Sequence, residues 1–308
     1  MKKINYLLSY IKILLSSLLK LEDIKVAIGR IEKRQEQGKY NIKQKLEDVE
    51  FKVFSQWGED GIIQYIINRI DISNKYFIEF GVEDYLESNT RFLLINNNWS
   101  GTIIDGSKKN VDLVKKQSIY WRFELEAINS FITSENINEL ILSSKNYQKD
   151  IGLLSIDIDG NDYWVWKNIE CINPIIVVIE YNSIFGFRHK VTIPYDANFY
   201  RTKRHYSNLY FGASLAALND LAISKGYSLV GSNSSGCNAF FVRNDFKDSF
   251  MCLAPEEAFR VAKFRESRNK KNKLTYLNND KALLMIKELP VVNLNNNEIV
   301  KIKDLYEI

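Results

Sequence analysis

Histidine and cysteine are scarce in this sequence of 308 residues, and their scarcity narrows the kinds of site that it can build. The two histidines, His189 and His205, are too few for a site that needs several imidazoles, such as a structural zinc centre. The three cysteines, Cys171, Cys237 and Cys252, lie far apart and form no CxxC pair. We therefore expect them to be reduced residues in the core of a cytoplasmic protein.

The sequence also lacks a large excess of charge of either sign. Its net charge is +4, and Lys and Arg are dispersed among Asp and Glu, so we expect no dedicated nucleic-acid surface. With 45% hydrophobic and 26% charged residues, most of the chain cannot be disordered. It is long enough for one α/β domain with appendages.

The first 48 residues predict a helical extension. Lys12 interrupts the apolar opening and no small-residue cleavage site follows, which argues against a signal peptide, and the segment is too polar to span a bilayer. One helical stripe is indicated by steps of three and four residues between Ile4, Leu7, Ile11, Leu14, Leu18 and Leu21. The stripe could pack on its own domain, mediate homo-oligomer formation or contact a membrane surface; we expect a homo-oligomer.

Residues 49–250 alternate between strand-like and helix-like segments, which predicts a doubly wound, mostly parallel α/β sheet. Strands are expected near residues 75–82, 101–105, 119–127, 151–158 and 175–180, with helices between them. Residues 227–245 predict a final antiparallel hairpin. A long loop at residues 183–211 is rich in aromatic and basic residues, which is typical of a binding loop. A basic helical tail is expected over residues 251–308.

Polar residues follow two continuous apolar runs, and these runs predict neighbouring strands buried on both faces. Asp157 and Asp159 follow the first run, while Glu180 and Asn182 follow the second. Parallel strands expose such tips side by side at the carboxyl edge of a sheet, where open α/β sheets bind ligands. These four oxygen donors suit Mg²⁺, although Glu180 and Asn182 could instead bind an acceptor directly. Asp162 could cap the next helix.

Another cluster of polar residues indicates nucleoside binding. Glu79 and Gly81 end the first strand and Asp105 ends the second, where a carboxylate can accept hydrogen bonds from ribose hydroxyls. Glu83 and Tyr85 stand where a glycine-rich phosphate loop would have further glycines. A pyrophosphate would find little room there, so a cofactor without phosphates and with a positive centre fits better.

The segments SQWGEDGIIQYI, FIEFGVEDYLESNTRFLL, GTIIDGS and SIDIDGND together resemble the FkbM-type branch of the S-adenosylmethionine-dependent methyltransferases, over about residues 53–245. The resemblance implies a seven-stranded class I methyltransferase sheet and methyl transfer to a hydroxyl. It implies that Glu79 and Gly81 flank the methionine part of the cofactor, that Asp105 holds the ribose, and that Asp157 lies near the methyl group. Further cofactor contacts are expected from Gln56, Asn89, Gly106 and Ser107.

These features predict an O-methyltransferase of a sugar or nucleotide sugar in capsule or surface polysaccharide synthesis. The alternatives are a nicotinamide-dependent oxidoreductase and a non-catalytic scaffold of a polysaccharide complex. Asp157, Glu180, His189 and His205 are the candidate catalytic residues, and either histidine could be the general base. A diphosphate could be held by basic residues of the loop and tail, which could equally be solvated: Arg188, Arg201, Lys203, Arg204, Arg260, Lys263, Arg265 and Arg268.

Overall fold

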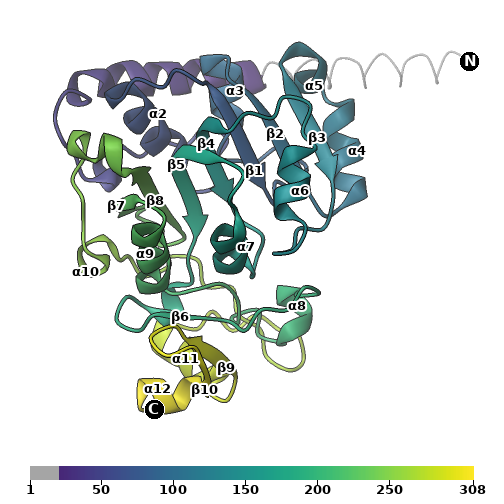
Figure 1. Ribbon diagram of the computed structural model, residues 1–308, viewed down its shortest axis with the longest axis vertical. Helices are drawn as coiled ribbons and strands as arrows, with labels where there is room; N and C mark the ends of the chain where they lie inside the picture. Colours follow the sequence, from purple (N-terminus) through teal and green to yellow (C-terminus); the bar gives the residue numbers. More distant parts are fainter. Residues whose placement is uncertain (1–20) are drawn as a thin grey trace, which may run out of the picture.

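A seven-stranded sheet forms the centre of the computed structural model, which describes residues 21–308 (Figure 1). The strands lie in the order β3-β2-β1-β4-β5-β8-β7. β8 alone runs antiparallel to its neighbours, as the predicted hairpin requires. The strands are β1 (Tyr76–Phe80), β2 (Ser100–Asp105), β3 (Leu125–Asn129), β4 (Asp150–Ile156), β5 (Asn173–Glu180), β7 (Tyr227–Ser232) and β8 (Asn238–Arg243).

Helices cover both faces of this sheet and give three layers (Figure 1). Alternate residues of each strand point to opposite faces, so Ile78 and Leu154 enter one core while Phe77 and Leu153 enter the other. The first core is covered by α6 (Ile137–Leu142), α7 (Asp162–Asn168) and α9 (Leu215–Ser224). The second is covered by α2 (Glu59–Arg69), α3 (Arg91–Asn97), α4 (Lys108–Lys116) and α5 (Ser118–Arg122).

A second, three-stranded sheet lies beyond the ends of β4 and β5 (Figure 1). It joins β6 (Val191–Thr192), from the long loop, to β9 (Pro290–Asn293) and β10 (Glu298–Lys301), near the end of the chain. α11 (Asn279–Ile286) and α12 (Ile302–Tyr306) pack against it around a separate apolar core. The short helix α8 (Arg201–Arg204) also belongs to the long loop. The loop is therefore paired with the tail, which its sequence did not indicate.

The helical tail predicted over residues 251–308 is wrong for much of its length, first of all at residues 256–273. Only α10 (Pro255–Ala258) is helical there, and an extended segment follows. Its backbone bonds to other parts of the chain, with Lys263 N donating to Ser235 O and Arg268 N donating to Ser207 O. Closely spaced basic residues also repel one another on a helix. Further along the tail α11 and α12 are helical as predicted, but the strands β9 and β10 lie between them.

The strand predicted over residues 119–127 is also partly wrong. Its first half forms α5, and β3 begins only at Leu125. Ile119 and the aromatic residues Tyr120 and Trp121 favour strands in general, yet Ile119 is buried against the domain from the helix. Tertiary packing therefore overrides the local preference.

The predicted N-terminal extension contains a helix over residues 21–36. It is followed by the 3₁₀ turns η1 (Gln37–Lys39) and η2 (Leu46–Val49). The apolar residues at positions 4–18 lie outside the described residues. None of the helices within residues 21–308 is both long enough and apolar enough to cross a membrane.

The three cysteines are unpaired, as expected, but they are not core residues. Cys252 is exposed, and Cys171 and Cys237 are half-buried. Each lies at or beyond the end of a regular element, where strand or helix burial does not enclose it.

Candidate active site

A cavity of about 720 Å³ lies at the carboxyl edge of β1, β2, β4 and β5. Side chains from the long loop and from residues 261–266 and 277–279 close its other side. It is in the size range of small-molecule sites. The residues predicted from the sequence that line it are Gln56, Glu79, Gly81, Asn89, Asp105, Gly106, Ser107, Asp157, Asp159, Glu180 and Asn182.

The turn after β1 adopts a left-handed backbone at three alternate positions. Gly81 has φ +72°, and Glu83 and Tyr85 have φ 48° and 62°. These are the positions at which a glycine-rich loop would carry glycine, so the backbone retains that geometry with larger side chains. Such conformations cost about 1–3 kcal/mol each in non-glycine residues and persist where surrounding contacts enforce them. The turn is thus held in a strained form beside the cavity.

Three side chains hold this turn in place, and one of them is Gln117, whose Nε2 donates to Asp84 O at 2.8 Å. The Asp105 carboxylate accepts hydrogen bonds from Glu83 N at 2.9 Å and Ser107 N at 2.7 Å. The Arg91 guanidinium donates to Tyr85 O at 2.9 Å. Asp105 also lines the cavity, so its carboxylate both orders the turn and faces the space where a ligand would lie.

Gly81 is required by a close approach between two strands. A Cβ at this position would overlap the carbonyl oxygen of Asp157. Its N–H donates to Ile104 O at 3.0 Å, which ties the end of β1 to β2. The absence of a side chain therefore lets the ends of β1 and β4 converge at the cavity.

Glu79 shapes the wall of the cavity through its carboxylate. One oxygen accepts from Asn89 N at 2.9 Å, and the other accepts from Ser88 Oγ at 2.7 Å and from Thr90 Oγ1 at 2.5 Å. Asn89 in turn donates to Ser155 Oγ at 3.1 Å. Burial raises the pKa of Glu79, and these hydrogen bonds oppose that shift. Glu79 is thus engaged with the segment that starts α3.

Asp157, Asp159 and Glu180 come together, as their positions after neighbouring strands predict. Each offers an oxygen that lies within 4.8 Å of the others, and we call these residues the acid trio. Burial and mutual repulsion raise the pKa values of Asp157 and Glu180 well above the ordinary carboxyl range. Glu180 Oε2 is buried and accepts no hydrogen bond from residues 21–308. Such an atom is costly unless a ligand or ion satisfies it.

Arg201 is the counter-charge of the acid trio. Its guanidinium lies 2.7 Å from Asp159 and its Nε donates to Asn208 O at 2.8 Å. It also stacks on the Phe211 ring at 3.8 Å from the centroid. Its positive charge lowers the pKa values of Asp157 and Glu180 but does not outweigh burial. One guanidinium therefore faces three carboxyl groups.

Asn182 lines the cavity, but its amide is engaged with the backbone, and Asp162 lies outside the lining. Asn182 donates to Leu209 O and Phe211 O, both at 3.0 Å, and its Oδ1 accepts from Ile184 N at 3.0 Å. The Asp162 carboxylate accepts from backbone N–H groups of the loop that follows β4, and burial raises its pKa to about 6. Asn182 thus seats the long loop, and Asp162 fixes the loop carrying Asp159 rather than capping α7.

The structure does not bring either histidine to the cavity. His189 packs against the Tyr306 ring, with centroids 4.7 Å apart. His205 Nδ1 lies 2.7 Å from Ser207 Oγ, and burial with the nearby Lys270 charge lowers its pKa. Neither residue lines the cavity. The general-base role expected for them has no support in this geometry, because the turns of the long loop carry both rings away from the acid trio.

Most basic residues proposed for diphosphate binding are paired within the protein. Arg204 lies 3.2 Å from Asp196, Arg268 lies 2.6 Å from Glu266, and Arg260 lies 2.9 Å from Glu47. Arg265 alone joins Arg201 in lining the cavity. Arg265 has no hydrogen-bond or ion-pair partner among residues 21–308.

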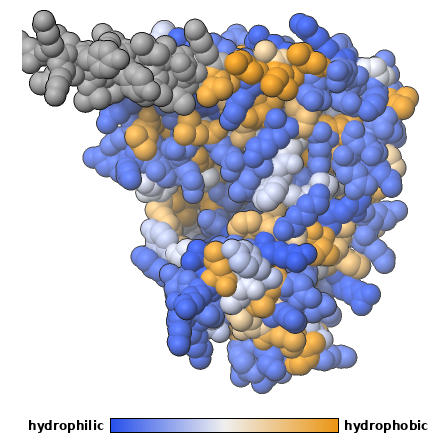
Figure 2. Space-filling model, turned by 180° about the vertical axis from the view of Figure 1, so that it is seen from behind, coloured by the Kyte–Doolittle hydropathy of each residue, from blue (hydrophilic) through white to orange (hydrophobic). Residues whose placement is uncertain are grey.

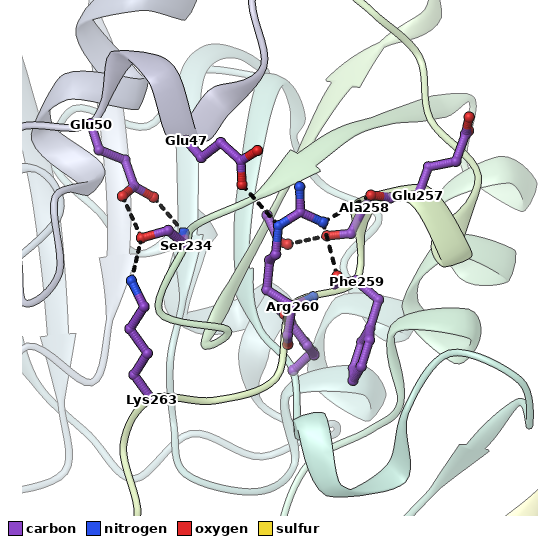
Figure 3. Close-up of polar contacts among 10 residues, drawn as sticks. Glu47, Glu50, Ser234, Glu257, Ala258, Phe259, Arg260 and Lys263 are labelled. Atoms are coloured by element: carbon purple, nitrogen blue, oxygen red, sulfur yellow. Dashed lines mark hydrogen bonds and ion pairs between the residues drawn. The ribbon is translucent and has the colours of Figure 1, made fainter.

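Polar contacts fasten the extended segment of the tail to residues 47–50 and 234 (Figure 3). Arg260 donates to Glu47, and Lys263 donates to Ser234 Oγ, which in turn donates to Glu50. Beyond these anchors the segment lines the cavity with Phe264 and Arg265. Arg265 is one of the basic residues considered for diphosphate binding, whereas no sequence pattern singled out Phe264.

The sheet order, with one antiparallel strand beside β5, defines the class I methyltransferase fold. No protein-family model matches the chain, and no curated protein matches it in sequence. The FkbM resemblance therefore stays a prediction.

Solved structures that resemble the chain include methyltransferase structures. The S-adenosylmethionine-dependent methyltransferase from Clostridium acetobutylicum ATCC 824 is 8% identical, with a TM-score of 0.38, and the match covers 60% of this chain and 90% of that one. The N-terminal domain of EvdMO1 with SAH bound is 10% identical, with a TM-score of 0.36. That match covers 55% of this chain and 73% of the EvdMO1 domain. With TM-scores below 0.5, these similarities add nothing to what the strand order defines.

Proposed function

We propose that this chain is an S-adenosylmethionine-dependent O-methyltransferase that acts on a sugar hydroxyl, as in the synthesis of capsule or surface polysaccharides. The observation that carries the proposal is that one cavity joins the left-handed turn and Asp105 to the acid trio. The first part suits a nucleoside, and the second suits the removal of a proton from a hydroxyl. S-adenosylmethionine bound there supplies a methyl group on a positively charged sulfur.

The cofactor half offers what a nucleoside without phosphates needs. Gly81 allows close approach to the backbone, and Asp105 presents a carboxylate for ribose hydroxyls. Glu83 lines the cavity from a position where a glycine-rich phosphate loop would have a glycine, so its side chain leaves less room for a pyrophosphate. This environment favours a cofactor with a positive centre over a nicotinamide dinucleotide.

The acceptor half offers a base. Asp157 or Glu180, when ionised, can take the proton of a bound hydroxyl, because burial raises their pKa values and makes them stronger bases than ordinary carboxylates. Holding the acceptor oxygen in line with the methyl group is the other requirement, and the enclosed walls of the cavity can meet it.

A divalent cation fits the same residues. Asp157, Asp159 and Glu180 are hard oxygen donors, and the unsatisfied Glu180 Oε2 is the atom that an ion would engage. Mg²⁺ held there supplies positive charge that lowers the pKa of a bound hydroxyl. Asn182, the fourth expected ligand, has its amide engaged with the long loop. We propose Asp157, Asp159 and Glu180 as the ligands of this cation.

The charge of the cavity favours an acceptor without phosphate. Its lining includes eight carboxyl groups, those of Glu79, Glu83, Glu87, Asp105, Asp157, Asp159, Glu180 and Glu266, against the two guanidinium groups of Arg201 and Arg265. A diphosphate would be repelled unless cations accompanied it. Of the two acceptor classes expected from the sequence, a sugar unit without phosphate fits this lining better than a nucleotide sugar.

Calorimetric titration tests the cofactor. We expect binding of S-adenosylmethionine and of S-adenosylhomocysteine and none of NADH. Binding of NADH alone would point to an oxidoreductase, and binding of no cofactor would point to a scaffold protein. Asp105→Asn should weaken binding, whereas Asp112→Asn, on the exposed side of α4, serves as the matched control.

Methyl transfer from isotopically labelled S-adenosylmethionine tests the acceptor. Pools of unphosphorylated oligosaccharides and of nucleotide sugars are compared by the mass shift of the product, with and without EDTA. We expect label in the unphosphorylated pool. Label only in the nucleotide sugars would refute the assignment of acceptor class. Full activity after EDTA treatment would show that methyl transfer does not require a divalent cation.

A further inference from the structure

The helix at residues 21–36 is attached to the domain by one face only. Val26 is buried, and Gly29 packs so closely on Val53 that a Cβ would overlap it. Arg91 lies 2.5 Å from Glu22, which ties the helix to α3. Packing on its own domain thus accounts for this face of the helix.

The opposite face is apolar and exposed. Leu21, Ile24, Ile28 and Ile31 have exposed fractions of 54%, 53%, 52% and 52%. Steps of three, four and three residues place them on one stripe of the helix. Figure 2 shows an apolar patch along the top of the molecule, beginning where the grey residues end. We call these four side chains the outer stripe. An exposed row of this kind marks an interaction surface.

Exposed basic residues, Lys25 and Arg34, lie on the two sides of the outer stripe. Residues 21–36 contain four acidic and four basic residues, so the excess of positive charge comes from residues 1–20, which contain no acidic residue. The neighbouring sequence at positions 1–20 adds Lys2, Lys3, Lys12 and Lys20 among many apolar residues. An apolar stripe with Lys and Arg beside it is the pattern of a helix that lies in the surface of an anionic membrane.

The spacing of the apolar residues favours a lipid surface over a second copy of the chain. A coiled-coil seam alternates steps of three and four over several heptads. Here the alternation holds from Ile4 to Leu21 and again from Leu21 to Ile31, but two successive steps of three meet at Leu21 and shift the stripe around the helix. Gln35 stands where the next seam residue would follow Ile31. Because lipid requires no fixed register, the interrupted stripe matches a membrane surface better.

We propose that the outer stripe, with Lys25 and Arg34, docks the protein onto an anionic lipid surface. The helix lies at one end of the molecule, and β4 and β5 run away from it toward the small sheet (Figure 1). Docking by the outer stripe would therefore hold the cavity on the side away from the lipid.

Vesicle flotation of the full chain tests the proposal. We expect the protein to float with phosphatidylcholine vesicles that contain phosphatidylglycerol and to float less with phosphatidylcholine alone. Ile24→Glu combined with Ile28→Glu should reduce the bound fraction about tenfold or more, since two apolar side chains lose their burial. Lys25→Glu combined with Arg34→Glu should abolish the preference for the anionic vesicles.

Ile223→Glu is the matched control, because Ile223 is 62% exposed on α9 and lies outside the outer stripe. It should float as the unmodified protein does. Light scattering provides the second measurement, and we expect the same subunit count for the Ile24→Glu and Ile28→Glu double variant. The proposal is overturned if the unmodified protein does not float or if the double variant floats equally well. A fall in subunit count in that variant also overturns it, in favour of self-association.

Discussion

Gly81→Ala should lower both the stability of the fold and the affinity for the cofactor. Two separate terms contribute to the loss of stability. The residue has φ +72°, a conformation that costs an alanine about 1–2 kcal/mol. The added Cβ would also overlap Asp157 O, a backbone atom that cannot rotate away. Forcing the ends of β1 and β4 apart adds about 1–3 kcal/mol, as for other overpacked sites. We expect the free energy of unfolding to fall by about 2–5 kcal/mol in total.

Gly226→Ala separates these two costs. Gly226, which follows the end of α9, also has a positive φ, of +84°, but nothing lies within 4 Å of the position that its Cβ would take. It should therefore show only the cost of the left-handed backbone, about 1–2 kcal/mol. Denaturant unfolding measures both free energies, and calorimetry measures the affinity for S-adenosylmethionine. Only Gly81→Ala should reduce that affinity. If both variants lose the same stability, the proposed approach of Gly81 to Asp157 is wrong.

Three further predictions concern the two halves of the cavity and the tail that closes it. Asp105→Asn should weaken S-adenosylmethionine binding by about tenfold or more in calorimetry, because a charged hydrogen-bond acceptor is worth about 1.5–3 kcal/mol; unchanged affinity would place the ribose elsewhere. Arg201→Met should move the acid limb of the pH–rate profile to higher pH. The Arg201 charge lowers the pKa values of Asp157 and Glu180, so its loss raises them further and the ionised base appears only at higher pH. An acid limb that stays in place would exclude these carboxyl groups as the base. Glu47→Ala should raise the acceptor KM but not the cofactor Kd, because it frees Arg260 and the tail segment; equal changes in both constants would contradict this division.

The central sheet could be predicted because its information is local. Continuous apolar runs end in Asp157 and Glu180, and parallel strands necessarily place such ends together. The start of α3 is less local, because its N-cap residue Thr90 makes no side-chain cap and its hydroxyl donates to Glu79 instead, while Ser88 Oγ accepts from Arg91 N at 3.3 Å.

The hydrogen-bond partners of the individual polar residues could not be predicted in the same way. Asn182 lies two residues after Glu180, yet it binds Leu209 O and Phe211 O, whose positions depend on how the long loop folds. The sequence also marked Glu83 and Tyr85 as departures from a glycine loop. The structure keeps the left-handed backbone at both, because Asp105 and Arg91 bond to it from elsewhere in the sequence.

The two halves of the cavity are built by contacts of different sequence separation. From this difference we expect the half formed by the tail to determine which acceptor is chosen. The cofactor half comes from strand ends whose neighbours are set by sheet order. The other half depends on a tail segment that Arg260 fastens to Glu47, 213 positions away in the sequence. Phe264 and Arg265 can therefore change without disturbing the strand ends. Substitutions at these two residues should alter the choice of acceptor and leave the binding of S-adenosylmethionine intact.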